Sequence, residues 1–168
     1  MSDDLDDGTH NAPLDRDEIE RLYERHGRVL LAYASALLLD VSAAEDTLHQ
    51  VFLKLLSNNV RVTGEPIGYL CRAVRNTALN RRRRQSREVA LDSHPWLESP
   101  AGMEEVSLAI QSAVRTLPQE QREIIVLRVW GSMTFEQAAQ TLEISVNTAA
   151  SRYRYGLEKL REKLKPLV

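Results

Sequence analysis

A short segment near the C-terminus carries polar side chains whose types and spacing suit contact with DNA. Within residues 147–155, amide, hydroxyl, guanidinium and phenol groups fall on one side of an expected helix. Such groups form hydrogen bonds with base edges and phosphate oxygens. The expected chemistry is therefore recognition of duplex DNA, without a covalent step. We call these residues the recognition set: Asn147, Thr148, Ser151, Arg152, Arg154 and Tyr155.

The surrounding sequence predicts the elements that present this set. Thr134 with Gln137 forms a capping box that begins one helix, and residues 143–145 supply a turn in which Ser145 caps the next helix. Another helix is expected before this pair, over residues 119–129 after Pro118. The pattern is typical of a helix-turn-helix, although a basic helix with an ordinary solvated face fits the last segment taken alone. Apolar residues at spacings of three and four predict the buried face of that segment: Ala149, Tyr153, Leu157, Leu160 and Leu164.

Charge is distributed unevenly along the chain. The net charge of the 168 residues is only −2, but residues 1–18 hold seven acidic residues and one arginine, a local charge of −6. Residues 61–87 hold eight arginines and one glutamate, a local charge of +7. An arginine cluster of this density neutralises several phosphates and gives an affinity that depends steeply on salt. The alternatives are a solvated arginine face and an RNA-binding patch.

Two helices are predicted in the N-terminal half. Asp15 with Glu18 forms a capping box for a helix that runs to about Leu39, and Ser42 with Glu45 is expected to begin the next helix. The second helix has one apolar face, comprising Leu48, Val51, Phe52, Leu55 and Leu56.

The opposite face of the second helix is polar but exposes a central leucine. Such a face suits a protein–protein contact, in which polar groups fix the register and the leucine supplies burial. An ordinary solvent face with one stray leucine fits the same residues. We call them the docking stripe: Asp46, His49, Gln50, Leu53 and Lys54.

A loop over residues 58–66 precedes a third helix, predicted from Pro66 to about Arg87. This helix combines cationic and planar side chains, which hold single-stranded DNA through phosphate contacts and base stacking. We call the candidate residues the strand-binding set: Arg61, Tyr69, Arg72, Arg75, Asn76, Asn80, Arg81, Arg82, Arg83 and Arg84.

Three blocks of the sequence resemble bacterial RNA polymerase sigma factors of the extracytoplasmic-function class, within the sigma-70 family. The run LPQEQREIIVLRVWGSMTFEQAAQTLEIS, which begins at Leu117, resembles their C-terminal DNA-binding region. Residues 44–56 resemble their helix for docking on RNA polymerase, and residues 69–76, continuing to residues 81–84, resemble their promoter-melting helix. The resemblance covers most of the chain after residue 18.

The resemblance implies a role for each set of residues. The docking stripe would contact core RNA polymerase, the strand-binding set the melted minus-10 element, and the recognition set the minus-35 element. Core polymerase and promoter DNA are the implied partners, and an anti-sigma factor is left open as a third. The chain departs from the usual family residues at His49, Gln50, Tyr69, Asn80 and Ala150.

The expected fold is all-α, with two small helical domains joined by a linker and a helix-turn-helix in the second domain. Residues 1–14 form an acidic tail, residues 15–88 a domain of the sigma region 2 type, residues 89–103 the linker, and residues 104–168 a domain of the sigma region 4 type. The function expected is promoter-directed transcription initiation. The alternatives are a stand-alone helix-turn-helix regulator that acts without polymerase, and an RNA-binding adaptor.

Other classes of function find no support in the sequence. The four histidines are scattered, and Cys71 has no partner cysteine for a zinc site or redox pair, so we expect no metal, cofactor or catalytic residues. The longest apolar run, residues 29–39, is far shorter than the roughly 20 residues that cross a bilayer. The first residues are acidic, whereas a secretory signal begins with basic ones, and a cytoplasmic location is expected.

Overall fold

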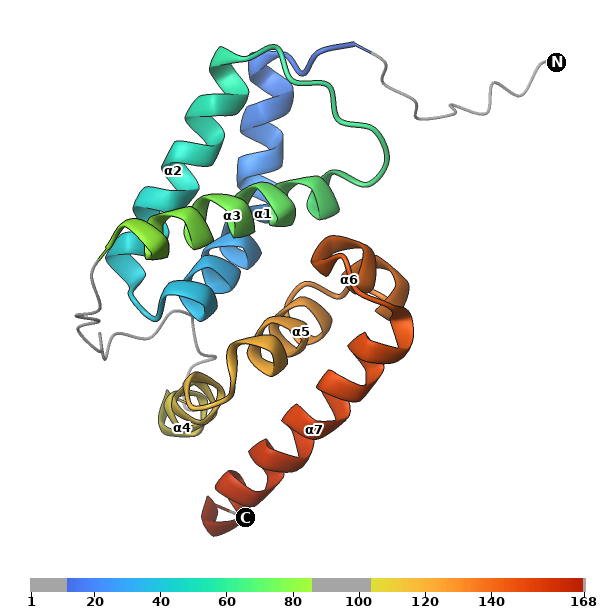
Figure 1. Cartoon of the computed structure of the whole chain (residues 1–168). Helices are drawn as coiled ribbons and strands as arrows, with labels where there is room; N and C mark the ends of the chain where they lie inside the picture. The colour runs from blue at the N-terminus through green and yellow to red at the C-terminus, as the bar shows by residue number, and fades with distance from the viewer. Residues whose placement is uncertain (1–11, 86–103, 168) are drawn as a thin grey trace, which may run out of the picture.

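The computed structural model describes residues 12–85 and 104–167, and every regular element in these ranges is helical (Figure 1). The predicted all-α class is confirmed. Most of the predicted tail and the whole predicted linker, residues 89–103, lie outside the described residues. The helices are α1 (Arg16–Leu38), α2 (Val41–Ser57), α3 (Pro66–Arg84), α4 (Glu104–Arg115), α5 (Gln119–Val129), α6 (Phe135–Leu142) and α7 (Val146–Leu164), followed by a short 3₁₀ helix, η1 (Lys165–Leu167).

The starts of α1 and α2 depend on two aspartates. Asp15 and Glu18 form the predicted capping box of α1. The predicted box at Ser42 is wrong, because Asp40 caps α2 and accepts a hydrogen bond from the Ala43 N–H at 3.0 Å. Leu39 adopts a left-handed backbone with φ 56°, which turns the chain so sharply that Asp40 is already the extended residue before the helix. Ser42 therefore falls inside the first turn.

The first three helices pack together around buried apolar side chains (Figure 1). Leu30, Tyr33 and Leu37 of α1 meet Leu70 and Val74 of α3 in a core shared with α2. Leu56, predicted to be buried on α2, is half exposed instead. At 100° per residue it lies at the edge of the apolar arc, on the side of Leu53.

Helices α6 and α7 form the predicted helix-turn-helix, and α4 and α5 pack against α7. Thr134 and Gln137 form the capping box of α6, Glu143 turns the chain with φ 55°, and the Ser145 hydroxyl accepts a hydrogen bond from the Thr148 N–H at 3.1 Å. Leu157, predicted to be buried, is 39% exposed, whereas Gly156 faces the core. A Cβ atom at Gly156 would lie 2.6 Å from Ile125 Cδ1, so any larger residue there would force the buried Ile125 side chain to shift.

The two groups of helices lie against each other. Helix α5 packs on α1, and α6 packs on α3 (Figure 1). The C-terminal helices therefore cover part of the helix that carries most of the strand-binding set. No helix within residues 12–85 and 104–167 has the length and apolar character needed to cross a membrane.

Candidate nucleic-acid and polymerase interfaces

The recognition set lies along the first half of α7. Asn147, Arg154 and Tyr155 are exposed, whereas Thr148, Ser151 and Arg152 are partly buried. The Arg154 guanidinium lies over the Tyr155 ring, 5.0 Å from its centroid, as in a cation–π contact. Arg152 turns toward α5, where its Nη2 atom lies 3.9 Å from Glu120 Oε1. The two arginines therefore leave the helix in different directions.

An aromatic cluster fixes α6 relative to α7. The rings of Phe135 and Tyr153 meet edge to face, with centroids 5.4 Å apart. The Arg128 guanidinium lies 4.4 Å from the Phe135 centroid and also donates a hydrogen bond to the Met133 carbonyl. Sequence reasoning missed this positioning role of Arg128 and Phe135, because the spacing of Arg128 is that of an ordinary solvated residue on α5.

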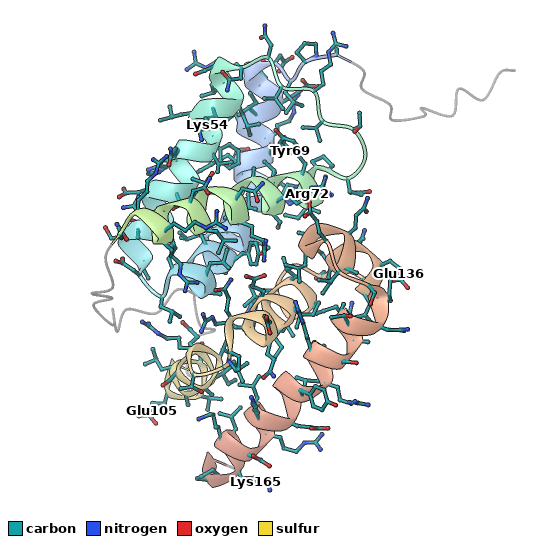
Figure 2. The ribbon with its side chains drawn as sticks, in the orientation of Figure 1. Lys54, Tyr69, Arg72, Glu105, Glu136 and Lys165 are labelled. Atoms are coloured by element: carbon teal, nitrogen blue, oxygen red, sulfur yellow. The ribbon has the colours of Figure 1, made fainter. Side chains whose placement is uncertain are left out.

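The docking stripe is exposed over its whole length on the outer side of α2, where Figure 2 labels Lys54. Leu53 is 63% exposed. Leu56 lies beside it and is 50% exposed, which adds a second apolar side chain to the surface available to a partner. Leu56 was not among the predicted contact residues, because its place in the apolar series suggested a buried position.

Some side chains of the strand-binding set are exposed, whereas others are partly buried or contact other residues. Arg61, Asn76, Asn80, Arg83 and Arg84 are exposed, whereas Tyr69 and Arg72 are partly buried on α3 (Figure 2). Arg81 connects this set with the docking stripe, because its Nη2 atom lies 3.2 Å from Asp46 Oδ2.

Two further arginines of α3 are held by the C-terminal domain. Arg75 Nε donates a hydrogen bond to Glu123 Oε2 at 3.1 Å, and Gln119 Nε2 donates to Glu123 Oε1 at 2.7 Å. Arg82 donates a hydrogen bond to the side-chain carbonyl of Gln119. Partial burial acts to lower the pKa of the Arg75 guanidinium, but the Glu123 carboxylate outweighs it and the pKa is raised.

A cleft of about 140 Å³ lies where the loop before α3 meets α6. Thr63, Glu65 and Arg72 line it from one domain, and Gln137 and Gln140 line it from the other. This loop includes Arg61 of the strand-binding set, which the family resemblance assigns to the melted minus-10 element. In this structure α6 and the loop line the same cleft.

Neither Cys71 nor the acidic residues form a reactive centre in the described chain. Cys71 is fully buried, and burial raises the pKa of its thiol to about 12, which keeps it protonated at neutral pH. Residues 12–85 and 104–167 contain no group of three His, Cys, Asp or Glu side chains arranged to hold a metal ion.

Comparison with known proteins identifies two family regions in the chain. Residues 22–88 match the family model described as Sigma-70 region 2, and residues 107–160 match the model described as Sigma-70, region 4. The chain is also similar to the RNA polymerase sigma factor SigZ of Bacillus subtilis (strain 168). The two are 26% identical over 152 residues, which cover 87% of this chain and 86% of SigZ.

Two solved structures share the fold. One is the sigma factor RpoE in complex with the anti-sigma factor NepR from Bartonella quintana, with a TM-score of 0.71, 21% identity, and coverage of 90% of this chain and 98% of that one. The other is CnrH in complex with the cytosolic domain of CnrY, with a TM-score of 0.67, 21% identity, and coverage of 90% of both chains.

Proposed function

The chain belongs to the sigma-70 family of RNA polymerase sigma factors, and on that premise we propose how its residues divide the work of promoter-directed initiation. The docking stripe together with Leu56 binds core polymerase. The strand-binding set on α3 and its preceding loop holds the melted minus-10 strand. The recognition set on α7 enters the major groove of the minus-35 element, as the second helix of a helix-turn-helix does.

The observation that carries this assignment is the exposed leucine pair on α2. Leu53 and Leu56 stand side by side in a stripe of polar groups, next to the arginine-rich helix. Exposed apolar residues that are rimmed by polar ones mark protein contact sites. A stand-alone helix-turn-helix regulator and an RNA-binding adaptor need no such surface beside their nucleic-acid contacts, so this feature favours the sigma-factor assignment over both.

Mixing the purified protein with core polymerase tests the docking assignment. We expect a stable co-migrating complex, and we expect Leu53→Glu to abolish it. The free energy of unfolding of that variant should change by about 0.5 kcal/mol or less, because the side chain is exposed. Ser112→Glu is the matched control, since it adds the same charge to an exposed position on α4, outside the docking stripe. Unfolding of Leu53→Glu, or undiminished binding by it, would contradict the assignment.

The proposal also places the protein in the cytoplasm, together with the polymerase, and gives the chain no catalytic step of its own. The Bartonella relative is bound to an anti-sigma factor in its structure. We propose that a partner of that class also binds this chain, which the purified pair would test directly.

A further inference from the structure

We propose that Val146, with Ala150 beside it on α7, contacts the C5-methyl group of a thymine in the minus-35 element. The inference rests on the proposed function of α7 and deepens it. Every member of the recognition set carries a polar group, whereas these two residues lie outside the set and carry none. The inference adds an apolar specificity contact and names the base that the contact selects.

Val146 is an exposed apolar side chain at the start of the recognition helix. It is the first residue of α7, directly after the Ser145 cap, and it is 40% exposed. A single exposed valine elsewhere on a protein surface would need no explanation. In a helix-turn-helix, however, the N-terminal residues of the second helix are the ones that reach base edges in the major groove. On the proposed docking of α7, the Val146 methyl groups therefore lie among base edges.

Ala150 continues the apolar surface along the same side of α7. Residues four positions apart are neighbours on a helix, so Ala150 lies one turn after Val146 and is followed one turn later by Arg154. Ala150 is partly exposed and Arg154 is exposed. Neither Val146 nor Ala150 has a side-chain donor or acceptor. Together they present methyl groups to the groove, beside the row that Asn147 and Ser151 form on the next side of the helix.

Hydroxyl groups in the first turn of α7 are engaged with the start of the helix. The Ser145 hydroxyl accepts a hydrogen bond from the Thr148 N–H at 3.1 Å, and the two hydroxyl oxygens lie 2.8 Å apart, within hydrogen-bond distance of each other. A base contact by either hydroxyl would have to disturb this pair. The first turn therefore offers DNA the exposed Asn147 amide and the Val146 methyl groups.

The C5-methyl group of thymine is the apolar group on the base edges of the major groove. The other groups on these edges are hydrogen-bond donors and acceptors. An apolar side chain that covers a donor or acceptor leaves it without a partner, which costs free energy. One that covers the methyl group removes apolar surface from water on both sides of the contact. The apolar pair should therefore favour a base pair that contains thymine over one that contains guanine and cytosine.

Removing single methyl groups from the DNA tests the inference with holoenzyme that contains the full-length chain. The probe is the minus-35 sequence that this holoenzyme selects from a randomised pool. It is resynthesised with one thymine at a time, on either strand, replaced by deoxyuridine, which keeps the base pair and lacks only the methyl group. We expect the replacement at one position to weaken promoter binding about fourfold, the loss expected for one methyl group that is no longer buried.

Two variants assign this loss to the apolar pair. With Val146→Ala the same replacement should weaken binding by less than about twofold, because the shortened side chain no longer covers the methyl group. Ala150→Ser should also reduce the loss, since it places a hydroxyl beside the methyl group. Val129→Ala is the matched control, because it removes the same atoms from a valine that is 50% exposed at the end of α5. It should retain the whole loss. Each value is a ratio of affinities for two duplexes measured with one protein, so a partly unfolded sample does not alter it.

Contrary outcomes separate the inference from the function on which it rests. If the selected element contains no A·T pair, or if no deoxyuridine replacement weakens binding, the inference fails while the proposed role of α7 remains. It fails in the same way if the thymine stays fully sensitive with either Val146→Ala or Ala150→Ser. If the holoenzyme selects no minus-35 sequence at all, the proposed role of α7 fails and the inference fails with it.

Discussion

Arg152 and Arg154 are two positions apart on α7, yet their surroundings differ. Arg152 is held toward α5 by Glu120, whereas Arg154 lies over Tyr155 on the exposed face. We therefore expect Arg152→Ala to weaken binding to all duplex sequences alike, as loss of a phosphate contact does. Arg154→Ala or Asn147→Ala should instead change the preferred minus-35 sequence, at about 1–3 kcal/mol per lost base contact.

Selection from randomised minus-35 sequences by holoenzyme carrying each variant measures this division. Loss of overall affinity at an unchanged preferred sequence is the result expected for Arg152→Ala. The division is reversed if Arg152→Ala alters the preferred sequence and the other two variants leave it unchanged.

Cys71 supports a prediction about reactivity. Because burial raises the pKa of its thiol to about 12, the thiolate is scarce at neutral pH and also screened from solvent. Alkylation of the native protein by iodoacetamide should therefore be slow, and it should become fast in denaturant. Mass spectrometry of both samples measures the rates. Equal rates in the two conditions would show that the helix opens readily around Cys71.

At the scale of elements, the end of α3 concentrates positive charge. Arg83 and Arg84 are exposed, while Arg81 and Arg82 contact Asp46 and Gln119. Replacing all four by alanine should weaken promoter-complex formation. The slope of log affinity against log salt should fall by up to about 3, since each phosphate contact on a single strand contributes about 0.7. Binding measured over a range of salt gives this slope, and an unchanged slope would show that these arginines do not contact phosphates.

The turn between α5 and α6 has room only for glycine at one position. A Cβ atom at Gly131 would lie 2.5 Å from the Leu127 carbonyl oxygen, which is backbone and cannot rotate away. Gly131→Ala should therefore lower the free energy of unfolding by about 1–3 kcal/mol. Denaturant unfolding of the purified variant measures the change. A variant as stable as the wild type would show that the turn can shift at little cost.

Local signals predicted most of the helices and failed where two signals competed. The boxes at Asp15 and Thr134 were predicted correctly, because a capping box involves residues only three apart. Ser42 was mistaken for a cap because the left-handed turn at Leu39 has no sequence signature outside glycine and asparagine. Leu56 and Leu157 were misplaced because both lie at the edge of an apolar arc, where exposure depends on how far a neighbouring helix reaches.

At the scale of the whole molecule, the contact between the domains could not be predicted. Glu123 lies within the helix predicted over residues 119–129, and nothing near it in the sequence indicates a partner at Arg75. Sequence patterns show what a helix buries but not which distant helix covers it. The functional roles of the three predicted sets thus remain predictions. How the sets lie relative to one another follows from the packing of the helices.

Arg115 connects α4 with the end of α1, so a variant there tests how the two groups of helices are held together. Arg115→Gln removes the charged donor to the Leu39 carbonyl, an interaction of the kind that contributes about 1.5–3 kcal/mol. We expect its radius of gyration to increase, without any change at the strand-binding set itself. Small-angle scattering over a range of protein concentrations makes the comparison. An unchanged radius would show that other contacts, such as the Arg75–Glu123 pair, are enough to hold the two groups of helices together.

The bond from Arg115 also has an electrostatic consequence for α1. The last turn of α1 contains no basic residue, so the negative end of its helix dipole is compensated by a cation from the other domain. Parting the domains removes that compensation, which dissolved salt weakens more than it weakens the buried Arg75–Glu123 pair. Rising ionic strength thus lowers the free energy needed to separate the domains, while it also weakens the contacts of the arginines with DNA phosphates. The full-length protein should therefore show a shallower salt dependence of DNA binding than its number of phosphate contacts would give.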